Sequence, residues 1–291
     1  MIEWYVLALV SALFSASAAI FEKKVLFKEK ALAFSTALAI FNLVLAIPFF
    51  FFIDMSSVSS ISLLVLFFKS ILGAFAFLCV MLGIKNLEIS NALPLLVLTP
   101  GFVAFFAFIF LKEVLSGIEL IGMLLLLGGT YILQLKLNQK FLDPFRIFLK
   151  SKGHKYIIGA LVLFTITSIL DKALLKNFKL PVFAFMGFQH LFLAIVFIAI
   201  VLFSGKIKEV AKPLKNSWKW ILPLAFLTIT YRYAQIEAVK AASVALVLSL
   251  KRVSVFFAVL IGGSLFNDHS LLRRVLATAV LILGAIFIIT G

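Results

Sequence analysis

The stretch Pro100–Glu113 reads PGFVAFFAFIFLKE, and from Phe102 to Leu111 every side chain in it is apolar. A second stretch, Val255–Asp268, reads VFFAVLIGGSLFND and ends on an acidic residue in the same place. Soluble proteins do not leave contiguous apolar surface on this scale facing water. The two stretches therefore predict segments that are solvated by lipid, and their shared layout points to an internal repeat.

The composition of the whole chain agrees with lipid as its solvent. Of 291 residues, 64% are apolar and 13% are charged, whereas soluble domains average about 45–50% and about 25%. The net charge of +15 would also suit a nucleic-acid-binding protein, but basic loops beside anionic lipid explain it without a nucleic-acid partner. The lone Cys79 and three widely spaced histidines exclude a disulfide framework and a zinc module, and we expect no cofactor and no metal.

The apolar runs are long enough for membrane-spanning helices, which need about 20 residues to cross about 30 Å of hydrocarbon. They are too long and too continuous for the strands of a membrane barrel. The N-terminal run resembles a secretory signal, but the only charge before Trp4 is Glu3, so we interpret it as a retained span. The sequence predicts an all-α membrane protein with ten spans: 4–21, 31–53, 61–83, 92–111, 118–135, 156–175, 181–204, 218–237, 241–265 and 272–290.

Most of the 27 Lys and Arg residues lie in or beside the odd-numbered connections between these spans. Because basic loops stay on the cytoplasmic side of a membrane, we expect the odd-numbered connections in the cytoplasm and both termini outside, in the inner or plasma membrane. The expected partners are membrane lipid and a small-molecule solute. The chain fits either a monomer or a homodimer.

The repeat extends over both halves of the chain. At an offset of 155 residues Glu113 matches Asp268, and at an offset of 149 residues Glu22 matches Asp171. We therefore divide the chain into a first repeat, 1–135, a basic connection, 136–155, and a second repeat, 156–291. Five spans in each repeat make the second copy enter the membrane from the opposite face. Inverted repeats around a site at mid-depth are typical of secondary transporters.

Particular motifs resemble those of a known family. The first half is similar to the EamA-type repeat of the drug/metabolite transporter superfamily in Asn91–Pro94, Pro100–Glu113, Gly122, Gly128 and Gly129. The second half resembles the other copy from Ser249 to Asp268, with Asp268 at the usual glutamate and Val255 at the usual proline. The resemblance implies ten helices in two inverted halves around a central cavity. That cavity would be lined by helices one, three, four, six, eight and nine, with five and ten at the periphery.

The resemblance also implies a range of solutes: amino acids, metabolites, nucleotide sugars or sugar phosphates, carried by exporters or exchangers. Within the ninth span, Lys251-Arg252-Val253 resembles the Lys-Arg pair with which triose-phosphate translocators hold phosphate. Those proteins have another basic residue in the fourth helix, four positions before its proline. This chain has Leu96 there.

Four basic residues lie inside the predicted spans, where a charged side chain is costly unless it faces water or a partner. Lys251 and Arg252, near the middle of span 241–265, are the leading substrate-binding candidates; the alternative is an ion pair or carbonyl contact that holds helices together. Arg232 lies deep in its span, and an interfacial aromatic belt is the alternative there. Lys69 lies about a third of the way along its span, and the alternative is that it extends to the membrane surface.

Uncharged residues complete the predicted substrate site. Gln235 is about one helical turn from Tyr231, so both can face one cavity. In the fourth span Pro94, Thr99 and Pro100 predict a kink whose freed carbonyls face that cavity, with Thr99 as a substrate-binding residue.

Two acidic residues are candidates for a coupling proton. Glu22 and Asp171 lie at or just beyond the ends of the first and sixth spans, and each is followed by Lys. The alternative is a solvated pair of opposite charges in a loop. A counter-substrate would replace the proton in an exchanger.

These features favour a secondary-active transporter that moves a small polar metabolite by alternating access. We expect an amino acid or another anionic or zwitterionic solute, and a sugar-phosphate or nucleotide-sugar exchanger is the alternative. A channel or a scaffold is the alternative of another class, but a channel would show a charged ring or a filter sequence. A membrane enzyme would need a cluster of His, Asp or Cys near one interface, and the sequence has none.

Overall fold

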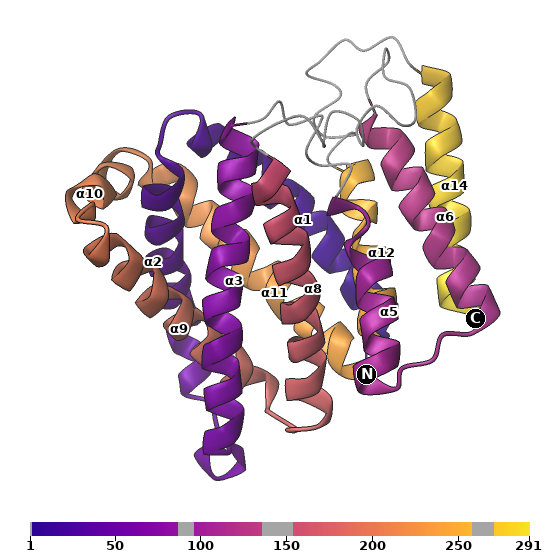
Figure 1. Ribbon diagram of the computed structural model, residues 1–291, viewed down its shortest axis with the longest axis horizontal. Coiled ribbons are helices and arrows are strands. Elements are labelled where there is room, and N and C mark those ends of the chain that lie inside the picture. The colour runs from indigo at the N-terminus through magenta and orange to yellow at the C-terminus, as the bar shows by residue number, and fades with distance from the viewer. Residues whose placement is uncertain (1, 87–95, 136–153, 258–270) are drawn as a thin grey trace.

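The computed structural model describes residues 2–86, 96–135, 154–257 and 271–291, and it is a bundle of helices without a strand in these ranges (Figure 1). In the first half the elements are α1 (Trp4–Leu26), α2 (Ala31–Phe50), the short 3-10 helix η1 (Met55–Ser57), α3 (Ser60–Asn86), α5 (Thr99–Leu111) and α6 (Gly117–Gln134). In the second half they are α8 (His154–Lys176), α9 (Val182–Phe203), α10 (Ile207–Asn216), α11 (Trp218–Ala241), α12 (Val244–Lys251) and α14 (Leu271–Thr290).

Eight of the ten predicted spans each coincide with one helix, and the all-α membrane architecture is confirmed. The other two spans, 92–111 and 241–265, lie partly outside the described residues. Within them α5 begins at Thr99, and α12 ends at Lys251, where a turn at Arg252 precedes the helical residues 253–257. By length and composition alone, five described helices can cross a membrane: α1, α2, α3 (as Ser60–Gly83), α8 (from Lys155) and α9. The apolar helices α5, α6 and α14 have shorter described stretches. Helix α11 is long enough, but Arg232 and Glu237 interrupt its apolar character. Thr228 and Gln235 of this helix are buried in the bundle, whereas Lys219 and Lys240 near its two ends are exposed.

Local sequence explains where several helices begin and end. Ser116 starts α6 with a capping box, in which its hydroxyl accepts from the Glu119 N–H and the Glu119 carboxylate accepts from the Ser116 N–H. Helix α5 ends at Lys112, whose left-handed backbone (φ 54°) reverses the chain. The connection that follows α5 thereby places Glu113 against the second half of the molecule.

Helix pairing follows a two-fold relation between the halves. Helices α2 and α9, α5 and α12, and α6 and α14 pack as pairs of equivalents. Helix α1 is equivalent to α8 and α3 to α11, so the two-fold relation maps the contact of α1 with α11 onto the contact of α8 with α3. In Figure 1, α6 and α14 lie side by side at one edge of the bundle.

The equivalent helices α6 and α14 run in opposite directions, as inverted repeats require. A Cβ at Gly122 of α6 would lie 2.8 Å from the carbonyl oxygen of Gly284 in α14, and one at Gly129 would lie 3.1 Å from that of Ala277. Contacts therefore move backwards along α14 as they move forwards along α6. Glycine is needed at these positions because the two backbones touch.

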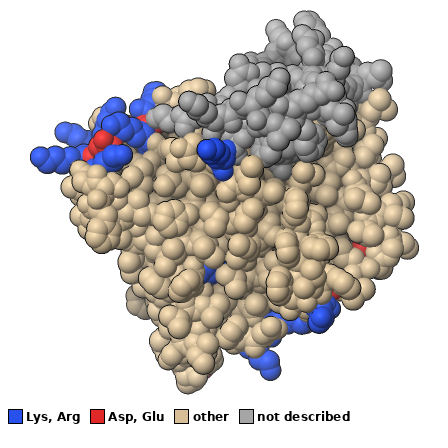
Figure 2. All heavy atoms as spheres, viewed as in Figure 1, with Lys and Arg blue, Asp and Glu red and all other residues tan. Residues whose placement is uncertain are grey.

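The surface separates lipid-facing from water-facing regions. Figure 2 shows a broad uncharged band across the molecule, with Lys and Arg gathered at its upper left, where Figure 1 places α10. Large apolar side chains such as Phe68, Phe105 and Phe110 are more than half exposed, which fits lipid contact. The stretch between spans 181–204 and 218–237 is predicted to be a connection without a helix. The structure corrects this, because helix α10 lies there. It is amphipathic, and Glu209 accepts a hydrogen bond from Lys30 at 2.6 Å.

Candidate functional site

A cavity of about 330 Å³ lies between the two halves. Its described lining comes from α1, α2, α3, α8, α9, α11 and α12 and from the start of α5, and includes no residue of α6 or α14. The peripheral place implied for the fifth and tenth helices is therefore found. The second and seventh helices, α2 and α9, line the cavity as well, which the resemblance had not implied.

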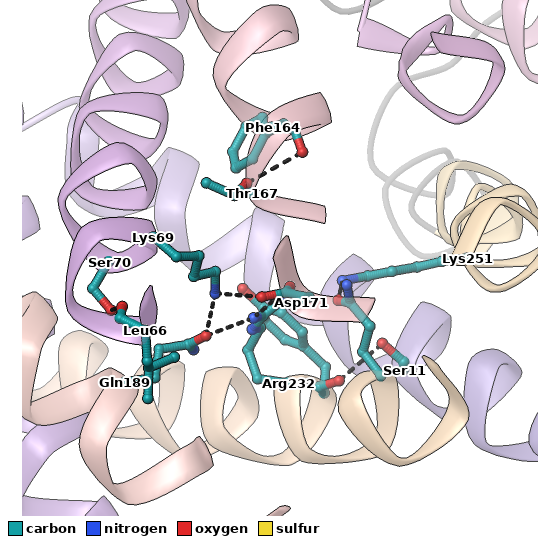
Figure 3. A network of polar contacts seen from close by, with 12 residues as sticks. Ser11, Leu66, Lys69, Ser70, Phe164, Thr167, Asp171, Gln189, Arg232 and Lys251 are labelled. Carbon is teal, nitrogen blue, oxygen red and sulfur yellow. Dashed lines mark hydrogen bonds and ion pairs between the residues drawn. The ribbon is translucent and has the colours of Figure 1, made fainter. Parts of the chain in front are cut away.

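Asp171 is the centre of an ionic network in this cavity (Figure 3). One carboxylate oxygen lies 2.7 Å from Lys69 Nζ, and the other lies 3.3 Å from an Arg232 guanidinium nitrogen. The Gln189 amide oxygen accepts from both cations, from Arg232 at 2.9 Å and from Lys69. Four helices, α3, α8, α9 and α11, are thus tied together by one carboxylate and one amide.

The position of Asp171 excludes the solvated loop pair that was the alternative for this residue. Helix α8 continues to Lys176, and Asp171 is only 4% exposed, so it does not form a solvated loop pair. Lys69 is 5% exposed and binds Asp171, so it does not extend to the membrane surface. Glu22 also lies within a helix, α1, which ends at Leu26, and it lines the cavity.

Lys251 lies at the end of α12 and is held by residues of α11. Its ammonium donates to the Gln235 amide oxygen at 2.6 Å and lies 4.4 Å from the centre of the Tyr231 ring. A cation at this distance from an aromatic face is attracted to it. Glu22 of α1 is close enough to Lys251 for electrostatic attraction. Gln235 and Tyr231 therefore face one cavity, as their spacing of one turn predicts.

Arg252 binds a backbone carbonyl that a proline at the start of α5 leaves free. Pro100 has no backbone N–H, so it leaves the carbonyl of Leu96, four residues earlier, without its helical donor. That carbonyl accepts from Arg252 at 2.8 Å and from the Thr99 hydroxyl at 2.7 Å. The predicted freed carbonyl thus exists, and it binds the protein's own guanidinium. This contact is the helix-joining alternative considered for Arg252. Pro94 lies outside the described residues.

A second buried ion pair lies outside the cavity lining. Lys172 Nζ lies 3.6 Å from the Glu113 carboxylate and donates to the carbonyl oxygens of Val239 and Ala242, at 2.8 and 2.7 Å. Glu113 in turn accepts from the Ser243 hydroxyl at 2.8 Å. The pair therefore joins the end of α5 to the junction of α11 and α12.

The structure brings together every described residue of the predicted substrate and coupling sites. All of them line this cavity: Glu22, Lys69, Thr99, Asp171, Tyr231, Arg232, Gln235, Lys251 and Arg252. Pro100 stands beside it, next to Thr99. Four of these residues are cationic and two are acidic, so the described lining carries two unmatched positive charges. An anion entering the cavity meets a favourable potential.

Sequence reasoning missed part of the lining. Ser35, Asn42, Gln189 and His190 also line the cavity. Asn42 is the one amide of a largely apolar helix, and Ser35 lies two turns before it on the same face. The spacing of these two residues could have predicted that α2 lines the cavity, because polar residues on one face of a membrane helix need polar neighbours.

Comparison with known proteins places the chain in a family. The sequence model of the EamA-like transporter family matches residues 2–135 and 151–290. A solved structure titled only as the crystal structure of a protein matches with a TM-score of 0.73 and 16% identity, and the match covers 98% of this chain and 96% of that one. That likeness concerns the fold. No curated protein matches the sequence.

Proposed function

Because the chain belongs to the EamA-like transporter family, we propose that it carries a small organic anion, or a zwitterion with an anionic group, across the membrane by alternating access. The observation that carries this proposal is the excess of cations around the cavity. Such charges are expensive at mid-membrane and persist where they serve a solute or an ion.

The ionic groups divide into two sets with different roles. Asp171 already binds Lys69 and Arg232, so in this set both cations have an anionic partner and one net positive charge is left over. Lys251 and Arg252 have mainly neutral partners, an amide oxygen and a backbone carbonyl. A solute anion gains more at the second set because its charge replaces these neutral contacts. We therefore assign Lys251 and Arg252 as the primary anion-binding residues.

Coupling to a proton is assigned to Glu22 in preference to Asp171. Each carboxylate lines the cavity, but Asp171 contacts two cations. Protonating it would leave both of those cations unmatched. Glu22 interacts electrostatically with Lys251, whose charge a bound anion would also neutralise. Binding of the solute and protonation of Glu22 are then linked through Lys251.

The inverted halves supply the conformational change. Two nearly equivalent halves can rock about a fixed central site, so that the site opens to one side and then to the other. Such a carrier exchanges labelled for unlabelled solute faster than it moves solute in one direction. A channel does not show this acceleration, so counterflow separates the two classes.

The proposal is tested with the purified protein in liposomes. A thermal-shift screen of carboxylates, amino acids and sugar phosphates identifies a ligand, since a ligand stabilises the state that it binds. Counterflow of that ligand should be abolished by Arg252→Gln and by Lys251→Gln. Lys208→Gln, which removes the same charge from exposed α10, should leave it unchanged. Unimpaired flux in both cavity variants would refute the proposal.

The coupling assignment has its own test. Glu22→Gln should retain counterflow but lose accumulation driven by a pH gradient. If the variant still accumulates solute in response to the gradient, Glu22 is not the coupling residue.

A further inference from the structure

One wall of the cavity has buried polar groups that the ionic network does not use. Ser35 and Asn42 on α2 and His190 on α9 all line the cavity, and they are 1%, 7% and 2% exposed. Among the described residues, the Ser35 hydroxyl, the Asn42 amide oxygen and both ring nitrogens of His190 have no hydrogen-bond partner. Buried polar groups are almost always paired, so the unpaired groups of this wall indicate a place where a bound ligand supplies the missing hydrogen bonds.

Several other hydroxyl groups of the cavity are hydrogen-bonded within their own helices. Ser70 donates to the carbonyl of Leu66 at 2.7 Å, and Thr228 donates to that of Leu224 at 2.8 Å. These bonds use the hydroxyl proton. One oxygen of Asp171 on α8 also makes no hydrogen bond, but it lies 2.7 Å from the Lys69 ammonium and is paired by charge. Among the neutral groups of the described lining, the buried atoms without a partner lie on α2 and α9, and they mark a local feature of one wall.

The wall stands beside the ionic network but is itself uncharged. His190 directly follows Gln189, whose oxygen binds Lys69 and Arg232. Ala39 and Leu38 lie between Ser35 and Asn42 and also line the cavity. A solute whose charged end is held by the cations would thus present its other end to small apolar and neutral polar groups.

The chemistry of these groups selects what they bind. The Asn42 oxygen accepts, the Ser35 hydroxyl both donates and accepts, and a neutral imidazole offers one donor and one acceptor. Hydroxyl groups match this mixture because each also donates and accepts. The ammonium group of an amino acid only donates, and near this wall it would meet Lys69 and Arg232, like charges that already occupy the carboxylate of Asp171.

We propose that Ser35, Asn42 and His190 form a hydroxyl-binding subsite, so that the solute is a polyhydroxylated organic anion, a sugar acid or a sugar phosphate. This inference rests on the proposed function, since it assumes that the solute's anionic group is held by the cations of the same cavity. It chooses between the solute classes that the charges alone leave open. A site built to bind a hydroxyl discriminates strongly against an analogue that lacks it.

The test compares matched anions on the purified protein in detergent by isothermal titration calorimetry. D-Gluconate is compared with hexanoate, and D-glucose 6-phosphate with methyl phosphate. We expect the hydroxylated member of at least one pair to bind at least about tenfold more tightly. Ser35→Ala and Asn42→Leu should reduce that preference. Ser70→Ala, an equally buried cavity serine whose hydroxyl is already bonded to its own helix, should keep it.

The outcomes separate this inference from the function on which it rests. If both members of each pair bind equally, the subsite is refuted while anion binding stands. If L-glutamate, tested alongside, binds more tightly than every hydroxylated anion, the hydroxyl assignment is refuted in favour of a zwitterion. If no anion binds, the inference and the proposed anionic solute both fail. Size-exclusion elution and melting temperature identify any variant that fails to fold, and His190→Phe then provides an independent variant of the same wall.

Discussion

Replacing Asp171 with Asn removes the central carboxylate and leaves two buried cations facing each other. The side chains of Asp171, Lys69 and Arg232 are 5%, 6% and 18% exposed, and the ion-pair distances are 2.7 and 3.3 Å. At an effective dielectric constant of about 20, these distances give gross attractions of about 6 and about 5 kcal/mol. Desolvation of the charges offsets much of this. Measured losses on breaking buried pairs put the net destabilisation at about 3–5 kcal/mol.

The loss should appear as a lower melting temperature of the purified protein. With about 2–4 °C per kcal/mol for chains of comparable size, Asp171→Asn should melt roughly 6–20 °C below the wild type. Adding Lys69→Met removes one of the unmatched cations, so the double variant should regain about 1–3 kcal/mol relative to the sum of the single changes. Glu209→Gln, which removes an exposed carboxylate from its pair with Lys30, should change the melting temperature little.

Two results would refute this reasoning. A melting temperature of Asp171→Asn equal to that of the wild type would mean that the carboxylate is not paired in the bundle. Strict additivity of the two substitutions would mean that Lys69 and Asp171 do not interact.

Three further predictions concern other parts of the molecule. Glu113→Gln should lower stability by about 2 kcal/mol in thermal unfolding, because it removes a charge-assisted contact to buried Lys172; no change would mean that this pair does not hold α5 to the α11–α12 junction. Gly122→Ala should lower the free energy of unfolding by about 1–3 kcal/mol, since its Cβ would meet the α14 backbone. Gly128→Ala, with open space around it, should be neutral or stabilising. Equal melting temperatures of the two variants would refute the close helix contact. The hydrogen bond from Lys30 lowers the pKa of Glu209 below the ordinary 4.5. The contact of α10 with α2 should therefore persist above pH 4.5 and weaken as the pH falls through that lowered pKa. The distribution of distances between spin labels on the two helices should broaden at acid pH, and an unchanged distribution would count against the pair.

The sequence alone determined the architecture, because membrane insertion is governed by local properties. A span needs about 20 apolar residues whatever the rest of the chain does, so the ten predicted spans could be read one at a time. The number of spans in each repeat then fixed the inverted relation of the halves. Arg232 and Lys251 also stood out, since a charge in an apolar segment is costly wherever the segment lies.

The tertiary structure decided which side chains meet. The rotation of each helix about its own axis depends on its neighbours, and no single span contains that information. Only the packing of α8 against α3 and α11 shows that Asp171 is a buried partner of Lys69 and not a loop acid. Only the approach of α12 to α5 shows that the carbonyl freed by Pro100 binds Arg252. The unpaired wall on α2 and α9 depends on packing in the same way, because a polar atom is satisfied or not according to what surrounds it in space.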